Sequence, residues 1–243
     1  MATRSRSRVR QSTRICRVPM HRVAILLSLL VALGGCGFAP EVTDRNANVL
    51  VIGDSILAWN RGDGTSVADV IEKRIGAPVL DASVPGATMR ASGVRAAVGL
   101  SIPGQIRAGD FGTIVLNGGA NDLRNTCGCS GCDAVLDRLS LQDYPALIAR
   151  LANARVVIVG YYGPVRGGGG SFSSCSDELA ELGRRLSRLA SSNPRVTFVP
   201  TREAIDGNPA FYDSDRVHPT PAGSEVIGGL VARALVANDG ASR

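Results

Sequence analysis

The stretch Asn48-Val-Leu-Val-Ile-Gly-Asp-Ser-Ile-Leu57 organises the interpretation of the whole chain. Its apolar run, Val49 to Ile52, predicts a buried strand that ends at Gly53. Asp54-Ser55 follows where a helix can begin, so the Ser55 hydroxyl would stand clear of the sheet and its N–H would lie at a helix N-terminus. A serine in that position can act as a nucleophile. Taken alone, however, Asp54 and Ser55 are more typical of residues that only cap a helix.

Apolar runs like this one recur along the chain and alternate with helical patterns. The predicted strands span residues 48–52, 78–82, 113–116, 155–159 and 195–199. The predicted helices span residues 66–74, 93–100, 134–152, 177–190 and 224–236, with a break or a new segment at Pro145 and a helix start at Thr220-Pro221. Strands that are apolar throughout indicate an α/β fold whose parallel sheet is covered by helices on both faces.

In such a sheet, functional residues gather beyond the carboxyl ends of the strands. This rule selects Ser55, Gly86, the segment 117–122 and the loop before the last helix, predicted over 201–217. That loop contains Asp215, and His218 directly follows it, three residues after Asp215. A nucleophilic serine needs a base such as histidine, and the base needs an acceptor for its second ring nitrogen. A surface histidine beside a solvated acidic loop is the alternative.

Acyl transfer also needs hydrogen-bond donors aimed at a developing oxyanion. Gly86 can present a bare N–H after a strand, and Asn121 can offer its side-chain amide after another. Each has a simpler alternative, since Gly86 follows Pro85 as in an ordinary turn and Asn121-Asp122 could cap a helix.

The N-terminal segment has the anatomy of a bacterial export signal. An Arg-rich region runs to Arg22, the apolar run from Val23 to Leu33 is too short to span a bilayer comfortably, and Leu33-Gly34-Gly35-Cys36 resembles the lipobox of bacterial lipoproteins. Ordinary signal cleavage and an uncleaved membrane anchor are the alternatives. We expect a signal over 1–35, lipidation of Cys36, a tether over 36–47, a catalytic domain over 48–237 and a frayed tail over 238–243. The protein would then be exported and attached to the cell envelope by a lipid anchor.

The net charge of +6 belongs to this leader. Residues 1–35 hold seven of the 27 basic residues and no acidic residue, so 20 basic and 21 acidic residues remain. The rest of the chain is nearly neutral, so the net charge gives no support for a nucleic-acid partner. The leader also contains His21, so His218 is the only histidine of the mature chain.

Four cysteines follow Cys36, namely Cys127, Cys129, Cys132 and Cys175. In an exported protein an even number predicts two disulfides, and four cysteines allow three pairings. A direct Cys127–Cys129 bond would be strained, so we expect Cys175 to bond into the 127–132 cluster. A zinc site is the weaker alternative, because the spacing lacks paired C-x-x-C units and a nearby histidine. The glycine run at 167–170 lacks the Gly-Lys-Ser/Thr ending of a phosphate loop, so it predicts a mobile loop.

Together these segments resemble the GDSL family, specifically its SGNH-hydrolase branch. The matching blocks are Gly53-Asp54-Ser55, Gly86, Gly119-Ala120-Asn121-Asp122 and Asp215-Arg216-Val217-His218-Pro219. The resemblance implies a flavodoxin-like three-layer α/β/α sandwich with a five-stranded parallel sheet, and neither a metal nor an organic cofactor. It also implies a triad of Ser55, His218 and Asp215, with Ser55, Gly86 and Asn121 around the oxyanion. The α/β-hydrolase alternative lacks its G-x-S-x-G elbow.

Members of that family hydrolyse esters and thioesters, so the resemblance predicts a serine hydrolase that forms an acyl-enzyme. Its substrate would be a small ester or an acylated glycan or lipid. The alternatives are an acyltransferase that passes the acyl group to an envelope sugar, and a binding protein without catalysis. A binding protein has no need for Ser55, Asn121, Asp215 and His218 together. The sequence leaves open the choice between hydrolase and transferase, the acyl and alcohol specificity, and the oligomeric state.

Overall fold

A computed structural model describes residues 47–151, 153–165 and 168–240. The predicted signal, Cys36 and nearly all of the tether lie outside these residues. Five strands form one parallel sheet in the order β2-β1-β3-β4-β5. They are β1 (Val49–Ile52), β2 (Val79–Asp81), β3 (Thr113–Leu116), β4 (Arg155–Val159) and β5 (Val196–Val199). This is the flavodoxin-like order, which confirms the predicted fold class.

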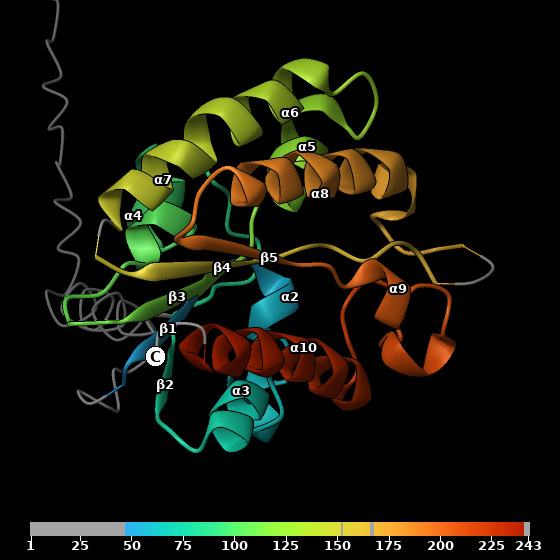
Figure 1. Ribbon diagram of the computed structural model, residues 1–243. Coiled ribbons are helices and arrows are strands. Elements are labelled where there is room, and N and C mark those ends of the chain that lie inside the picture. The colour runs from blue at the N-terminus through green and yellow to red at the C-terminus, as the bar shows by residue number, and fades with distance from the viewer. Residues whose placement is uncertain (1–46, 152, 166–167, 241–243) are drawn as a thin grey trace, which may run out of the picture. The chain divides into compact units, whose positions relative to one another are not determined.

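The central strands are apolar because both of their faces are covered. Leu50, Val51 and Ile52 of β1 are fully buried, and in register Val51 lies beside Val115 of β3. Helices α6 (Asp133–Arg138), α7 (Tyr144–Arg150) and α8 (Ser176–Ser191) lie on one side of the sheet, and α3 (Val67–Ile75) and α10 (Pro221–Gly240) lie on the other (Figure 1). The three layers are those that the sequence predicts.

Several helix boundaries differ from the prediction. The expected helix over 134–152 consists of α6, a π-helical turn (Leu139–Asp143) and α7, with Pro145 in the first turn of α7. Proline is accepted there because it has no N–H to pair. Helix α4 (Gly93–Ala97) is shorter than predicted, and α10 continues to Gly240, past the position where fraying was expected.

Three further helices had no predicted bounds, although the sequence indicated that helices could begin at Ser55 and near Asn121-Asp122. They are α2 (Ser55–Ala58), α5 (Ala120–Cys127) and α9 (Arg202–Ile205). Segment 201–217, predicted as a loop, contains α9 and a 3-10 turn (Pro209–Phe211). Helices of four residues are too short to show an apolar period of 3.6 residues, so sequence pattern does not reveal them.

The four cysteines form two disulfides, Cys127–Cys132 and Cys129–Cys175, so Cys175 does bond into the cluster. These bonds occupy the sulfurs that the zinc alternative needed. Within the described part of the chain no three His, Cys, Asp or Glu side chains form a group that could hold a metal. None of the described helices is long and apolar enough to cross a membrane.

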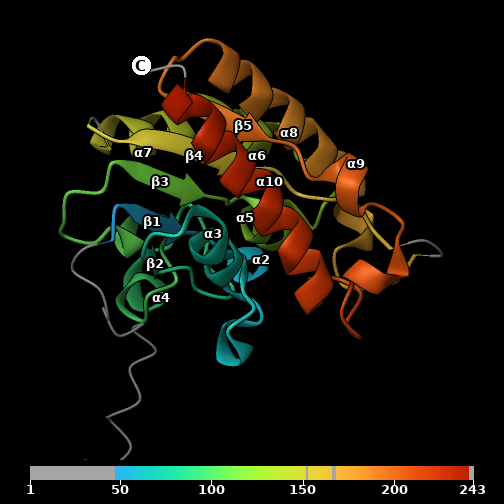
Figure 2. The same ribbon diagram turned by 60° about the horizontal axis from the view of Figure 1, so that its bottom comes forward.

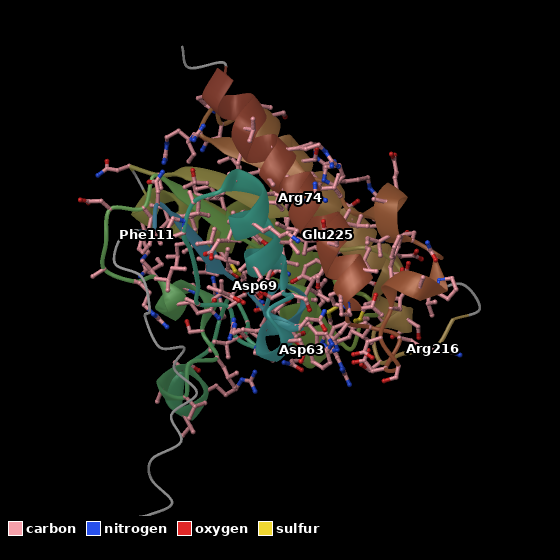
Figure 3. All side chains as sticks on the ribbon, turned by 90° about the horizontal axis from the view of Figure 1, so that it is seen from below. Asp63, Asp69, Arg74, Phe111, Arg216 and Glu225 are labelled. Carbon is pink, nitrogen blue, oxygen red and sulfur yellow. A yellow bond between two sulfur atoms is a disulfide. The ribbon has the colours of Figure 1, made fainter. Side chains whose placement is uncertain are left out.

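The packing of α3 against α10 depends on Gly228. A Cβ at this position would lie 2.6 Å from Cβ of Val70 and 3.0 Å from the Val67 carbonyl oxygen. The two helices lie side by side (Figure 2), and Arg74 of α3 pairs with Glu225 of α10 at their exposed edge (Figure 3). At the next position, Gly229, a Cβ would meet only the guanidinium of Arg74, at 3.3 Å. That flexible group can move aside.

We therefore expect opposite effects from alanine at two neighbouring glycines. Gly228→Ala should lower the free energy of unfolding by about 1–3 kcal/mol, because the extra methyl overpacks the contact between helices. Gly229→Ala should leave it unchanged or raise it by up to about 1 kcal/mol, through the better helix propensity of alanine. Urea unfolding of both variants measures the difference. Equal effects at the two positions would contradict this account of the packing.

Candidate active site

The turn after β1 requires glycine at position 53. A Cβ on Gly53 would lie 2.0 Å from Oδ1 of Asn117, and the φ angle of Gly53 is +156°. The buried side chain of Gln105 binds both backbone polar groups of Gly53. The Gly53 N–H donates to Oε1 of Gln105 (2.6 Å), and Nε2 of Gln105 donates to the Gly53 carbonyl (2.9 Å). The backbone that leads into Ser55 is therefore fixed before the helix starts.

Asp54 is the N-cap of α2, as the simpler interpretation of the sequence expected. Its Oδ1 accepts from the N–H of Ile56 (3.0 Å) and from Nδ2 of Asn117 (3.0 Å), and its Oδ2 accepts from the Tyr161 hydroxyl. The carboxyl is buried, and burial raises its pKa although these hydrogen bonds lower it in part. The cap is Asp54 and Ser55 is the first residue of the helix, so capping does not occupy the Ser55 hydroxyl.

Ser55, His218 and Asp215 form one hydrogen-bonded chain. The Oγ of Ser55 lies 2.8 Å from Nε2 of His218, and Nδ1 of His218 is hydrogen-bonded to Oδ2 of Asp215. The carboxylate partner assigns the proton to Nδ1, which leaves Nε2 to accept from the serine hydroxyl. The structure therefore brings together the three residues that the sequence selects as nucleophile, base and acceptor.

The carboxylate of Asp215 is held in its charged form. Its Oδ1 accepts from the N–H groups of Val217 (2.9 Å) and His218 (3.0 Å). Partial burial raises the pKa of Asp215, but the backbone hydrogen bonds from His218 and Val217 and the bond to the imidazole outweigh burial, and the pKa lies below its usual value. A charged Asp215 can stabilise an imidazolium.

A tight turn supports this pair of residues. Arg216 between them has a φ of +60°, and the N–H of Asp213 donates to the His218 carbonyl at 2.8 Å. Residues 168–170 of the glycine run pack against the turn: a Cβ on Gly170 would lie 2.7 Å from the Arg216 carbonyl oxygen, and Arg216 Nη1 donates to the Gly168 carbonyl (2.8 Å). The sequence predicts a mobile loop here, and its described residues border the turn that carries His218.

The two other predicted oxyanion donors lie beside each other. Nδ2 of Asn121 donates to the carbonyl of Ala87 (3.0 Å), the residue after Gly86. Asp122 binds the N–H of Met89 (2.8 Å), so the Asn121-Asp122 pair fixes the loop that follows β2. Gly86 has a φ of +77°, a conformation that favours glycine. The backbone N–H of Ser55 is at the first position of α2, where N–H groups have no hydrogen-bond acceptor within the helix.

A pocket that is partly open to solvent adjoins Ser55 and Asn121. Its wall is mostly apolar or aromatic: Ile56, Tyr161, Tyr162, Phe172, Leu179, Tyr212 and Val217. The hydroxyls of Tyr162 and Tyr212 donate to the carbonyls of Val217 and Gly163, both at 2.7 Å. Burial is the largest of the causes that raise the pKa of Tyr212 to about 12, so this phenol is neutral at pH 7. The pocket can accept an apolar group next to the serine.

Sequence reasoning missed three residues of the site and gave a fourth no specific role. Gln105, Asn117 and Tyr161 support the turn from beneath, and Trp59 stacks on His218 with 3.7 Å between ring centroids. Asn117 lies in the selected segment 117–122, because it opens the polar run that follows β3. The other three carry no usable signal, because their contacts depend on distant segments of the chain.

Comparisons place these features in a family. The sequence pattern of the GDSL-like lipase/acylhydrolase family matches residues 51–226. No curated protein sequence matches the chain. Among solved structures, TesA is 22% identical with a TM-score of 0.56, covering 77% of this chain and 97% of that chain. A catalytic mutant of Axe2, an acetylxylan esterase from Geobacillus stearothermophilus, is 19% identical with a TM-score of 0.55, covering 76% and 92%. The lipase Lip_vut3 from a goat rumen metagenome is 18% identical with a TM-score of 0.53, covering 76% and 96%. At these identities the structures show a shared fold.

The lowered pKa of Asp215 predicts a loss of stability in acid. A carboxyl whose pKa is lower in the folded state stabilises the fold above its unfolded value of about 3.9, and this contribution disappears as the pH falls through the folded value. The stability difference between wild type and Asp215→Asn should therefore shrink as the pH falls below the unfolded value of about 3.9. Urea unfolding above and below this pH measures it. A difference that stays constant throughout would contradict the charged state assigned to Asp215.

Proposed function

This chain belongs to the GDSL-like lipase/acylhydrolase family, and we propose that it is a serine hydrolase that cleaves carboxylic esters through an acyl-enzyme. One observation carries the proposal. The Oγ of Ser55 lies 2.8 Å from Nε2 of His218, whose other ring nitrogen is hydrogen-bonded to Asp215. A base within hydrogen-bond reach of a hydroxyl, itself oriented by a carboxylate, is what an activated serine requires.

The proposed reaction has two steps. His218 removes the proton of Ser55 as Oγ attacks the acyl carbon, and the imidazolium then protonates the alcohol that leaves. Water, deprotonated by the same imidazole, attacks the acyl-enzyme and releases the acid with Ser55 restored. The N–H groups of Ser55 and Gly86 and the amide of Asn121 would stabilise the oxyanion. Each such donor is worth roughly 2.7–4 kcal/mol in enzymes of this chemistry.

The pocket wall indicates the class of substrate. The hydroxyls of Tyr162 and Tyr212 donate to backbone carbonyls and that of Tyr161 donates to Asp54, so the rings offer apolar surface to a ligand. We infer that this pocket takes an apolar part of the ester, such as an acyl chain longer than acetyl. Among the similar structures, Axe2 is named for acetylxylan and Lip_vut3 as a lipase, so both acylated carbohydrate and lipid esters belong in the substrate search.

The direct test is hydrolysis of p-nitrophenyl esters from acetate to octanoate. Wild type should turn over at least one of them, and Ser55→Ala should lose at least about 10³-fold in kcat because the nucleophile is gone. Ser173→Ala is the matched control, since Ser173 lines the same pocket while the ring nitrogens of His218 bind Ser55 and Asp215 instead. This variant should retain activity. Equal, negligible rates for wild type and Ser55→Ala on every ester would overturn the proposal.

The same series tests the assignment of the pocket. Burial of one methylene is worth about 0.8 kcal/mol, so kcat/KM should rise roughly fourfold per added methylene until the pocket is filled. Phe172→Ala removes part of the apolar wall and should flatten this rise. A rate that falls steadily from acetate onward would show that the acyl group does not enter the pocket.

We further infer that the enzyme is anchored to the bacterial cell envelope through Cys36. Support comes from the short apolar run before Leu33-Gly34-Gly35-Cys36 and from the two disulfides, which are typical of oxidising compartments. In a bacterial host, the full-length protein should be recovered in the membrane fraction with an acylated N-terminal Cys36. Cys36→Ser should move it to the soluble fraction. Mass spectrometry that finds an unmodified Cys36 in mature wild-type protein would contradict the anchor.

A further inference from the structure

Trp59, the only tryptophan of the chain, lies flat against the imidazole of His218. The ring centroids are 3.7 Å apart and the planes are inclined by 7°. Trp59 is the C-cap of α2, and its backbone N–H donates to the carbonyl of Ser55 (2.9 Å). The stack therefore connects the helix that carries the serine to the histidine that contacts this serine.

A second contact fixes the indole ring. Its Nε1 donates to Oδ2 of Asp213 at 2.9 Å. Asp213 belongs to the same turn as His218, because its N–H donates to the His218 carbonyl and its carbonyl accepts from the N–H of Arg216, both at 2.8 Å. The hydrogen bond from the indole, with that from the N–H of Ser214, lowers the pKa of Asp213. Asp213 is thus a charged anchor for Trp59 at neutral pH.

The next residue contacts the chain on the other side of His218. Nδ2 of Asn60 donates to the Pro219 carbonyl (2.9 Å) and to Oγ of Ser224 (3.0 Å). Trp59 and Asn60 therefore bind the segments before and after the histidine. These contacts set the position of the base relative to α2, and hence relative to Ser55.

The stack supplies a restraint that the hydrogen bonds of His218 lack. Its bonds to Ser55 and Asp215 lie in the plane of the imidazole, so they resist tilting of the ring only weakly. A flat aromatic surface against one face opposes this tilt. The π face of an indole also attracts a cation, and proton transfer from Ser55 would make the imidazole a cation.

We propose that Trp59 is a positioning residue for His218, holding the imidazole at the angle needed for proton transfer from Ser55 and stabilising its protonated form. The inference rests on the proposed function for its catalytic consequence. The stack itself is independent of any substrate.

Several charged or titratable groups surround His218, and Trp59 is a neutral neighbour among them. Asp215 and Arg216 lie on its own turn, Asp213 lies behind the indole, Asp54 acts from the start of α2, and Tyr162 binds the Val217 carbonyl. Replacing Trp59 by Leu or by Phe removes none of these five groups, but both variants lose the indole hydrogen bond to Asp213. A difference in pH dependence between the Leu and Phe variants would therefore report the loss of the π face.

The kinetic test compares Trp59→Leu with Trp59→Phe across pH, using an ester that wild type hydrolyses. Loss of a cation–π contact corresponds to roughly a 3- to 30-fold effect, so we expect kcat of the Leu variant to fall within that range, with a smaller effect for Phe. The acid limb of kcat/KM should move to lower pH in the Leu variant, because protonation of the base becomes harder. Phe111→Leu is the control, since Phe111 is far from Arg216 of the site turn (Figure 3). An acid limb that does not move would leave only a structural role for Trp59 and overturn the inference.

A second measurement needs no substrate. The single tryptophan makes fluorescence a direct probe of the stack, because a protonated imidazole in contact quenches an indole. Emission of wild type should fall in one transition on acidification, and His218→Asn should lack that transition. If wild type hydrolyses esters but its emission shows no such transition, the inference fails alone. If the transition occurs and no ester is hydrolysed, the stack stands, and the proposed function fails together with the catalytic consequence assigned to Trp59.

Discussion

The hydrogen bond between Ser55 Oγ and His218 Nε2 is the interaction on which the interpretation of this molecule depends. It joins residues that are 163 positions apart, and only the parallel sheet makes the contact possible. Parallel strands direct all of their carboxyl ends to one edge, so β1 delivers Ser55 where β2 delivers the Gly86 loop and β3 delivers Asn121. His218 does not follow a strand directly but lies just before α10, and the packing of α10 against α3 keeps that segment in place.

The turn that leads into Ser55 is supported by a buried polar network that is costly to build. Asp54, Asn117, Gln105 and Tyr161 bind one another or the Gly53 turn, and three of them are nearly inaccessible to solvent. Burying a carboxyl is unfavourable unless its lone pairs are satisfied, and here Ile56, Asn117 and Tyr161 satisfy them. As a consequence, the backbone of Ser55 has little conformational freedom. This is what a hydroxyl needs if it is to stay at hydrogen-bond distance from a base. The stack of Trp59 on His218 likewise restrains the imidazole, which is the other member of the Ser55–His218 pair.

Much of this could be predicted from residues alone, for identifiable physical reasons. Unbroken apolar runs such as Val49 to Ile52 indicate buried parallel strands, and polar residues directly after them indicate the functional edge. His218 is the only histidine outside the predicted leader, and with Asp215 three residues earlier it left few choices for a base. Contacts that depend on the tertiary fold could not be found in this way. Gln105 reaches Gly53 from a segment with no motif, the pairing of Cys129 with Cys175 needed the backbone, and the four-residue helix α9 is too short to show a period.

The central claim is that Ser55 is a nucleophile activated by His218. It is tested most directly by mass spectrometry of the intact protein after exposure to a fluorophosphonate, followed by peptide mapping. The account predicts a single covalent adduct on the peptide that contains Ser55, formed slowly in His218→Asn and absent in Ser55→Ala. No adduct on the wild type, or an adduct on another residue that persists in Ser55→Ala, would contradict it.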